Sequence, residues 1–383
     1  MSFENDIAKL NEHFFFQEFT FSKNQFSPIP GSEVELADNL IWLDEMTIVF
    51  QLKERNVSGD STVEAERKWF EKKVLGVATR QIRDTLTYLN SSHQIDVENH
   101  RGHRFLLISS NVSTVHKVVC YATVHELPDE CSRKKFHISS TAGVIHLFSA
   151  HDYLGIVQTL LTPSELSEYL DFREELINRW GTDCESVPEQ ALVGQYLDGN
   201  SESPPSIDYL EHLNSLSARA DEWDMSGIIK NFPDRITTDN QPTEYYSIVA
   251  EMAKLKRNEL RHFKLRFQLA MEKSREGKFA LPYRMASLRT GCAFVFIPLD
   301  SEMAAQRQQG LVNLTIGCKY DLKMNKCIGV SFAPEDGGWY IVEWCFLESE
   351  WQPDAEIERW LKESNPFSPV NTEVIERYDY HDS

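Results

Sequence analysis

The spacing of apolar residues over the first 150 positions changes several times between a helical and a strand period. Apolar residues recur at helical spacing in two segments, and the pattern predicts a helix in each: residues 3–15 and 63–89. Apolar runs of strand length occupy the segments between and after them: residues 34–43, 47–53, 104–110, 117–124 and 143–150. This order predicts an α/β or α+β domain over residues 1–150, with one sheet flanked by helices.

Beyond residue 150 the pattern becomes helical and then returns to strands. A helix is predicted to begin at Thr162-Pro163 and to end at Gly181, and a polar, proline-rich break follows at 197–206. Later elements are a long helix, three strands and a last helix: residues 243–276, 291–299, 327–333, 339–348 and 354–363. We therefore expect an acidic helical region over 151–240 and a C-terminal α/β domain for sensing or assembly over 241–383.

The net charge of −20 is concentrated in the middle of the chain. Residues 1–150 hold 20 acidic and 16 basic residues, residues 151–240 hold 18 and 5, and residues 241–383 hold 21 and 18. Both ends are nearly balanced, so basic surfaces for nucleic acid remain compatible with the acidic total. The basic helix of residues 254–275 is expected to contact an acidic surface of this chain or of another subunit, with nucleic acid as the alternative.

Three further features favour a cytoplasmic protein without a membrane segment. No apolar run approaches the roughly 20 residues that a membrane span needs. The first ten residues are polar and acidic, unlike a signal peptide. The seven cysteines are scattered, odd in number and without a CxxC pair, which predicts reduced thiols.

Candidate chemistry comes from the stretch LIWLDEMTIVFQLKER, residues 40–55. Alternate strand residues share a face, so Gln51 and Lys53 project together. The summed positions of paired residues are constant in an antiparallel hairpin, and a turn at 44–45 therefore places Asp38 opposite Gln51. A carboxylate, an amide and an ammonium would then meet at one sheet edge. Phosphodiester hydrolysis uses this combination, since oxygen ligands hold Mg²⁺ and a lysine offsets negative charge.

Asp38 followed after twelve residues by Gln51-Leu52-Lys53 resembles the PD-(D/E)XK nuclease signature in its QxK form, as in Mrr-like restriction endonucleases. The likeness covers residues 1–150 and is shared with nuclease domains of bacterial anti-phage defence. It implies a restriction-endonuclease-like core in which Lys53 is catalytic. Asp38, Gln51 and the carbonyl of Leu52 would bind Mg²⁺ or Mn²⁺.

The chain departs from that signature at several points. Gln51 is neutral, so the site has one carboxylate fewer, and the QxxxY helix signature is absent. A further acid is left open between Glu12, Glu18 and Glu35, with Glu35 as a candidate metal ligand. The resulting hypothesis is a metal-dependent endonuclease of DNA that acts in prokaryotic defence, as an oligomer or with a partner defence protein. The alternative is a non-catalytic adaptor that retains the nuclease-like fold.

Overall fold

The computed structural model describes residues 2–29, 31–56, 61–92, 94–217, 220–238, 241–299, 306–335 and 337–371. Contacts within the chain divide its described residues into two compact units, the first within residues 1–218 and 229–235, the second within residues 219–228 and 236–371. The fold is mixed α/β, as the sequence predicts. Over the residues described, none of the helices combines the length and the apolar character needed to cross a membrane.

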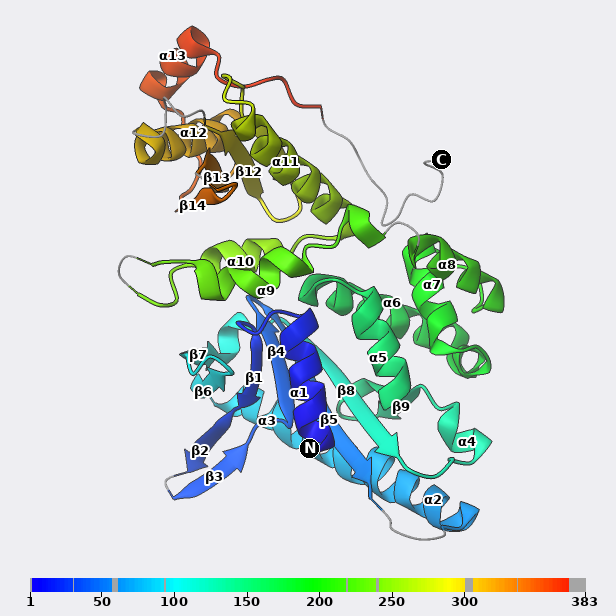
Figure 1. The fold of residues 1–383 in the computed structure, drawn as a ribbon. Coiled ribbons are helices and arrows are strands. Elements are labelled where there is room, and N and C mark those ends of the chain that lie inside the picture. The colour runs from blue at the N-terminus through cyan, green and yellow to red at the C-terminus, as the bar shows by residue number, and fades with distance from the viewer. Residues whose placement is uncertain are drawn as a thin grey trace. The chain divides into compact units, whose positions relative to one another are not determined.

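A mixed eight-stranded sheet forms the centre of the first unit, in the order β7-β6-β1-β4-β5-β8-β10-β9 (Figure 1). Strand β5 pairs with β4 antiparallel and with β8 parallel. The strands are β1 (Thr20–Lys23), β4 (Asn39–Leu43), β5 (Met46–Arg55), β6 (Gln94–Asn99), β7 (Arg104–Ile108), β8 (Thr114–Thr123), β9 (Phe136–Ser139) and β10 (Gly143–Ser149). Beside them, β2 (Gln25–Ile29) and β3 (Ser32–Glu35) form a separate hairpin.

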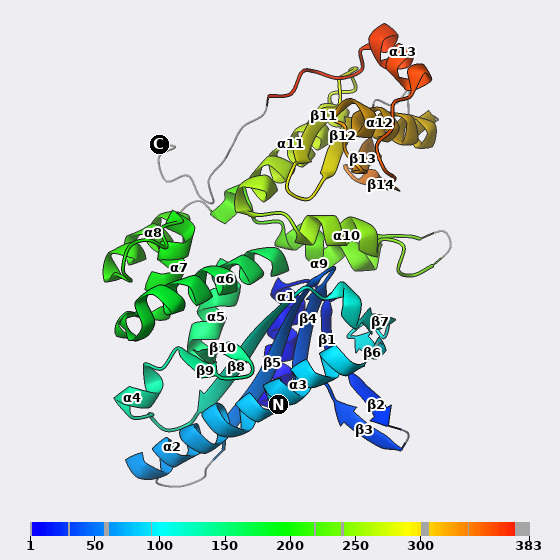
Figure 2. The same cartoon turned by 180° about the vertical axis from the view of Figure 1, so that it is seen from behind.

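Helices cover both faces of this sheet. On one face lie α1 (Phe3–Phe14) and α5 (Ala150–Thr159), and on the other lies a continuous helix made of α2 (Val63–Trp69), the π-helical η1 (Phe70–Val77) and α3 (Ala78–Ser91) (Figure 2). The Thr62 hydroxyl caps this long helix by accepting a hydrogen bond from the Ala65 amide at 3.2 Å. The predicted helix of residues 63–89 is therefore confirmed, with a π-helical segment inside it.

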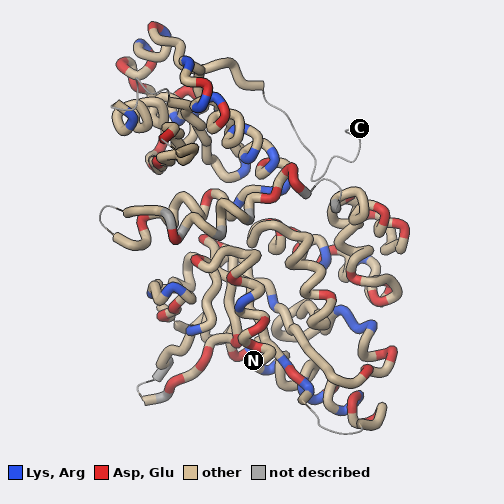
Figure 3. The backbone as a smooth tube through the Cα atoms, in the orientation of Figure 1, with Lys and Arg blue, Asp and Glu red and all other residues tan. Residues whose placement is uncertain are grey.

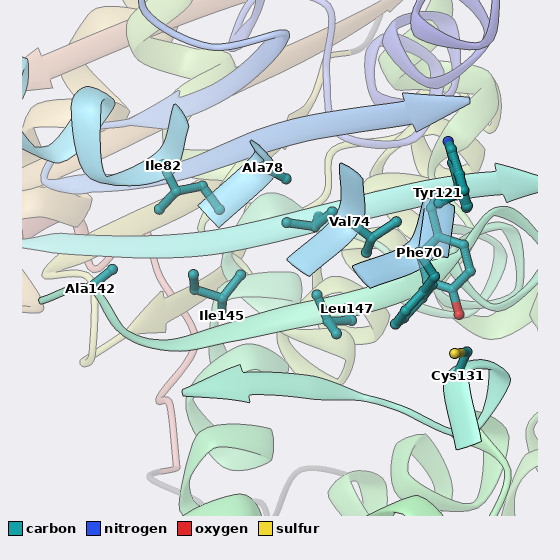
Figure 4. Packing of buried hydrophobic residues seen from close by; sticks show 11 residues of the cluster. Phe70, Val74, Ala78, Ile82, Tyr121, Cys131, Ala142, Ile145 and Leu147 are labelled. Carbon is teal, nitrogen blue, oxygen red and sulfur yellow. The ribbon is translucent and has the colours of Figure 1, made fainter. Parts of the chain in front are cut away.

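The long helix is fixed on the sheet by apolar residues four positions apart. Phe70, Val74, Ala78 and Ile82 point toward strands β8 and β10 (Figure 4). All four are at most 1% exposed, and the Phe70 ring meets the ring of Tyr121 edge-on at 5.3 Å between centroids. Burial of each large apolar side chain contributes about 1.5–3 kcal/mol. This row of contacts sets the rotation of the helix about its axis.

The rest of the first unit is largely helical, and it contains a fully buried ion pair. Its remaining helices are α4 (Asp129–Ser132), η2 (Ser109–Asn111), α6 (Pro163–Trp180), η3 (Gly181–Ser186), α7 (Glu189–Asp198), η4 (Ile207–Tyr209) and α8 (Leu210–Ser217). The guanidinium of Arg173 lies 2.8 Å from the Glu189 carboxylate, 3.0 Å from Nδ1 of His146 and 2.9 Å from the carbonyl of Lys135. Burial alone would raise the pKa of Glu189, but Arg173 and the Lys135 ammonium hold it at about 2.

The second unit is built on a four-stranded sheet in the order β11-β12-β13-β14. Its strands are β11 (Tyr283–Ser287), β12 (Cys292–Pro298), β13 (Lys326–Pro334) and β14 (Tyr340–Glu348). The predicted β13–β14 hairpin is confirmed, although β11 and α12 lie outside the predicted elements. The predicted helix of residues 243–276 is interrupted at residues 254–256. The helices are η5 (Ala220–Glu222), α10 (Tyr246–Ala253), α11 (Arg257–Arg275), α12 (Arg307–Asp321) and α13 (Ala355–Ser364). Helix α9 (Ser226–Arg235) begins in this unit, and its residues 229–235 belong to the first one.

Helix α11 carries the basic segment singled out in the sequence, and its charges are used within the unit. Phe263 and Phe267 of this helix pack against the sheet. Arg257 stacks on the ring of Trp223 at 4.9 Å, and Arg261 forms an ion pair of 3.0 Å with Glu222. These contacts favour the internal role of the basic helix over a nucleic-acid surface.

Removal of the buried guanidinium tests how far this unit depends on its ion pair. We expect Arg173→Met to lower the free energy of unfolding by about 3–5 kcal/mol, because Glu189 would keep a buried charge without its main partner. The measurement is guanidinium unfolding of the full chain, followed by circular dichroism. The control is Arg179→Met, whose exposed pair with Glu175 should contribute less than about 1 kcal/mol. Equal losses in the two variants would contradict this account.

Candidate active site

The register of the β4–β5 hairpin brings the predicted site residues together. Asn39 pairs with Phe50 and Leu43 pairs with Met46, so the predicted register is confirmed. The turn includes Asp44 in the left-handed region, at φ 50°. One step beyond the Asn39–Phe50 pair, this register sets Asp38 opposite Gln51, on the face of the sheet that α3 covers.

Asp38 binds both the backbone and the side chain at the end of β5. Its Oδ2 accepts hydrogen bonds from the Leu52 amide at 2.6 Å and from Nζ of Lys53 at 3.2 Å. Lys53 Nζ also donates to the Leu52 carbonyl at 2.8 Å. Both side chains are only 12% exposed, and within the described residues no hydrogen bond reaches Oδ1 of Asp38. The ammonium is thus held in one place with one carboxylate oxygen still available.

Gln51 is the most unusual member of the group. It is 2% exposed, and its Oε1 is buried without a hydrogen-bond partner in the described structure. A buried polar atom left in this state costs about 1–3 kcal/mol of stability. The position therefore needs a donor or a cation that the described residues do not supply.

A cavity of about 200 Å³ lies beside these residues. The segment around β3 and β4 forms one wall, with Glu35 and Asp38, and helix α3 forms the other, with Gln81 and Asp84. Gln81 has a second buried Oε1 without a partner in the described structure. The hydroxyl of Thr85 donates to the Leu36 carbonyl and so ties the two walls together.

Glu35 brings a second carboxylate close to Asp38. Burial raises its pKa, the negative charges of Asp38 and Glu4 raise it further, and Lys53 acts in the opposite direction. Glu4 comes from the start of α1, and no residue spacing in the sequence pointed to it. Glu35 is thus the one of the three open acids that lines the cavity.

Glu12 and Glu18, the other two acids, lie elsewhere. Glu12 is 3.5 Å from Nδ1 of His100, and Glu18 is 1% exposed, and neither lines the cavity. Gln81 and Asp84 line it but were not predicted as site residues. The available signal was their place on the helix flank next to the buried row that includes Ile82.

The oxygen atoms at the cavity fit a hard divalent cation better than a soft one. Asp38, Glu35 and the buried amide oxygen of Gln51 line the cavity, and the Leu52 carbonyl lies next to them, where it accepts from Lys53. All are the kinds of donor that Mg²⁺ or Mn²⁺ accepts together with water. The described residues contain no group of three or more His, Cys, Asp or Glu placed to hold a metal. A bound ion would therefore depend on the amide and the carbonyl as well as on the acids.

Comparisons with known proteins give no further guidance on this site. No protein-family model, curated protein or solved structure matches the chain. The interpretation of the cavity accordingly depends on its own geometry and on the chemistry of its donors.

Replacement of the buried amide tests whether the cavity accepts a cation. We expect Gln51→Glu to lower the melting temperature in EDTA, because it adds a carboxylate beside Asp38 in a buried position. Mg²⁺ or Mn²⁺ should raise the melting temperature of this variant more than that of the wild type. Gln94→Glu, at an exposed position of β6, is the control and should respond to neither. A variant whose stability ignores both ions would exclude Gln51 from the ligand set.

Proposed function

We propose that the first unit is a metal-dependent nuclease that hydrolyses phosphodiester bonds, with DNA as its substrate. The observation that carries this proposal is that Asp38 and Gln51 line one acidic cavity, while Asp38 also holds the Lys53 ammonium. Within the described structure, the buried amide oxygen of Gln51 has no hydrogen-bond partner. This oxygen borders the cavity, so it is open to a cation bound there. A hydrolytic site for phosphate esters has a use for each of the three groups.

Each residue has a role that follows from its position. Asp38 Oδ1, Gln51 Oε1 and the Leu52 carbonyl would hold Mg²⁺ or Mn²⁺, with Glu35 adding charge. When bound, the ion would polarise the phosphate and lower the pKa of a water molecule. Lys53 is held by Asp38 and Leu52, so its ammonium needs little reorganisation to offset charge on the phosphate or to orient a water.

The resemblance of residues 1–150 to anti-phage nuclease domains supports an effector role in prokaryotic defence. The second unit has its own sheet and core, which suits a sensing or assembly part. An oligomer or a partner defence protein would then control when the site acts.

The second candidate function is a non-catalytic adaptor that retains the fold. The observation in its favour is that, among the described residues, no three His, Cys, Asp or Glu side chains are placed to hold a metal together, although Glu35, Asp38 and Asp84 all line the cavity. Plasmid DNA incubated with the protein and Mg²⁺ or Mn²⁺, in parallel with EDTA, separates the two candidates. Metal-dependent nicking supports the nuclease, and intact plasmid under all conditions supports the adaptor.

Isosteric changes at the ion pair provide the direct test of the site. Lys53→Met and Asp38→Asn should each lower the cutting rate at least about 100-fold, because each removes a charge that acts on the phosphate or its metal. Both variants keep the side-chain volume, so their circular dichroism spectra should match the wild type. Lys23→Met is the control, since this lysine of the same sheet is 73% exposed and pairs with Glu98. Wild-type rates in Lys53→Met would refute the assignment.

The raised pKa of Glu35 predicts how activity depends on pH. Because its pKa is raised above the ordinary 4.5, its carboxyl takes up a proton at a higher pH than an ordinary glutamate, so cutting should weaken as the pH falls from neutrality toward that raised pKa. Glu35→Gln removes this titration and should flatten the acidic limb of the pH–rate profile. An acidic limb of unchanged shape in Glu35→Gln would show that another group titrates there.

A further inference from the structure

The basic residues of the long helix fall into two groups. Arg67 and Lys68 form ion pairs. Arg67 lies 2.8 Å from Glu64 and 2.5 Å from Glu130, and Lys68 lies 3.4 Å from Glu64. The other four are exposed and form no ion pair within the described part of the chain: Lys72, Lys73, Arg80 and Arg83. Acidic and basic residues are interspersed over this unit (Figure 3). The paired and the unpaired basic residues of the helix therefore differ in whether an acidic side chain of the described residues lies within ion-pairing distance, not in the local amino-acid composition.

The rotation of the helix places some of these cations next to the cavity. The row of buried residues that includes Ala78 and Ile82 faces the sheet. On the neighbouring flank, Gln81 and Asp84 line the cavity. Steps of four residues from Gln81 toward the helix N-terminus lead along that flank to Lys73.

Lys72 and Arg80 precede Lys73 and Gln81 by one residue, and they lie on the outward side of the helix. We call Lys72, Lys73 and Arg80 the basic ridge. Gly76 lies midway along it, at an exposed position without a side chain, and leaves room for another molecule to approach the helix.

The length of the ridge matches a short stretch of nucleic-acid backbone. Eight residues separate Lys72 from Arg80, which corresponds to about 12 Å along a helix axis. One strand of a duplex advances about 3.4 Å per phosphate, so the ridge spans roughly three or four phosphates. Three cations over this length suit a regular polyanion, even though Glu71 and Asp84 flank them.

We propose that the basic ridge binds the backbone phosphates of the nucleic-acid strand that reaches the cavity. That the bound strand continues to the cavity rests on the proposed nuclease function. The ridge lies on the same helix as the residues that line the cavity, one turn away from them. Binding itself does not need the cutting reaction. The ridge neutralises phosphates next to the scissile one, whereas the acid-lined cavity admits a phosphate only together with a cation.

The experiment measures binding without cutting, in the full-length chain. Labelled duplex and single-stranded DNA are titrated in EDTA, by fluorescence anisotropy, at salt concentrations between about 50 and 200 mM. The triple variant Lys72→Ala/Lys73→Ala/Arg80→Ala should bind about tenfold or more weakly than the wild type. Its slope of log affinity against log salt should be smaller by about 2–3, because each phosphate that a side chain no longer neutralises lowers the slope by close to one.

The matched control is Arg67→Ala/Lys68→Ala, which removes two paired charges from the same helix. It should bind within about twofold of the wild type, and all variants should share one melting temperature within error. Equal weakening in the control and the triple variant would overturn the proposal, and so would a wild type that binds no DNA. Displacement of DNA by polyglutamate at equal charge would also overturn it, since any polyanion would then suffice.

The outcomes for the ridge and for the nuclease are separable. If the wild type binds DNA through the ridge but does not cut it with Mg²⁺ or Mn²⁺, the nuclease function is rejected and the proposed binding role of the ridge stands. If the wild type cuts DNA and the triple variant binds and cuts DNA equally well, the proposed role of the ridge is rejected and the nuclease function stands.

Discussion

The register of strand β5 is the constraint on which the rest of the first unit depends. β5 is paired in parallel with β8 along all ten residues, Met46–Arg55, and antiparallel with β4 over Met46–Phe50. A slip of one residue would turn Gln51 and Lys53 toward α1 and α5, and Phe50 toward α3. Phe50 packs on the ring of Tyr153 at 5.6 Å, so the apolar face holds the polar face in position. The chemistry at the cavity is thus fixed by residues that take no part in it.

Stability and site chemistry oppose each other at the end of this strand. The sheet and the long helix bury apolar residues almost completely, yet between them lie two carboxylates close together and two amide oxygens to which the described residues offer no partner. A core selected for stability alone would have replaced these groups with apolar side chains. The hydrogen bond from Thr85 to Leu36 and the ion pair of Lys53 with Asp38 hold this costly arrangement together.

The sequence predicted those elements that depend on residues close together in the chain. The hairpin register, the long helix and the Thr162 cap of α6 follow from spacing and capping, and the structure confirms them. The short strands β1, β6 and β9 carry weak patterns, and they form because neighbouring strands of the sheet offer them hydrogen bonds. Gln81 and Asp84 reach the cavity through tertiary packing, and Glu4 acts on Glu35 through its charge, and no spacing along the chain reveals either. Metal binding, cleavage and the defence role remain predictions.

The π-helical segment η1 makes the number of residues between α2 and α3 matter more than their identity. Buried residues four apart drift by about 40° per step around a straight α-helix. The wider π turns offset this drift, which is how Phe70, Val74, Ala78 and Ile82 can all face the sheet. Deletion of one residue from η1 would rotate everything after it by about 100° and carry Gln81 and Asp84 off the cavity. Related chains are therefore expected to vary in the side chains of this segment while keeping its length.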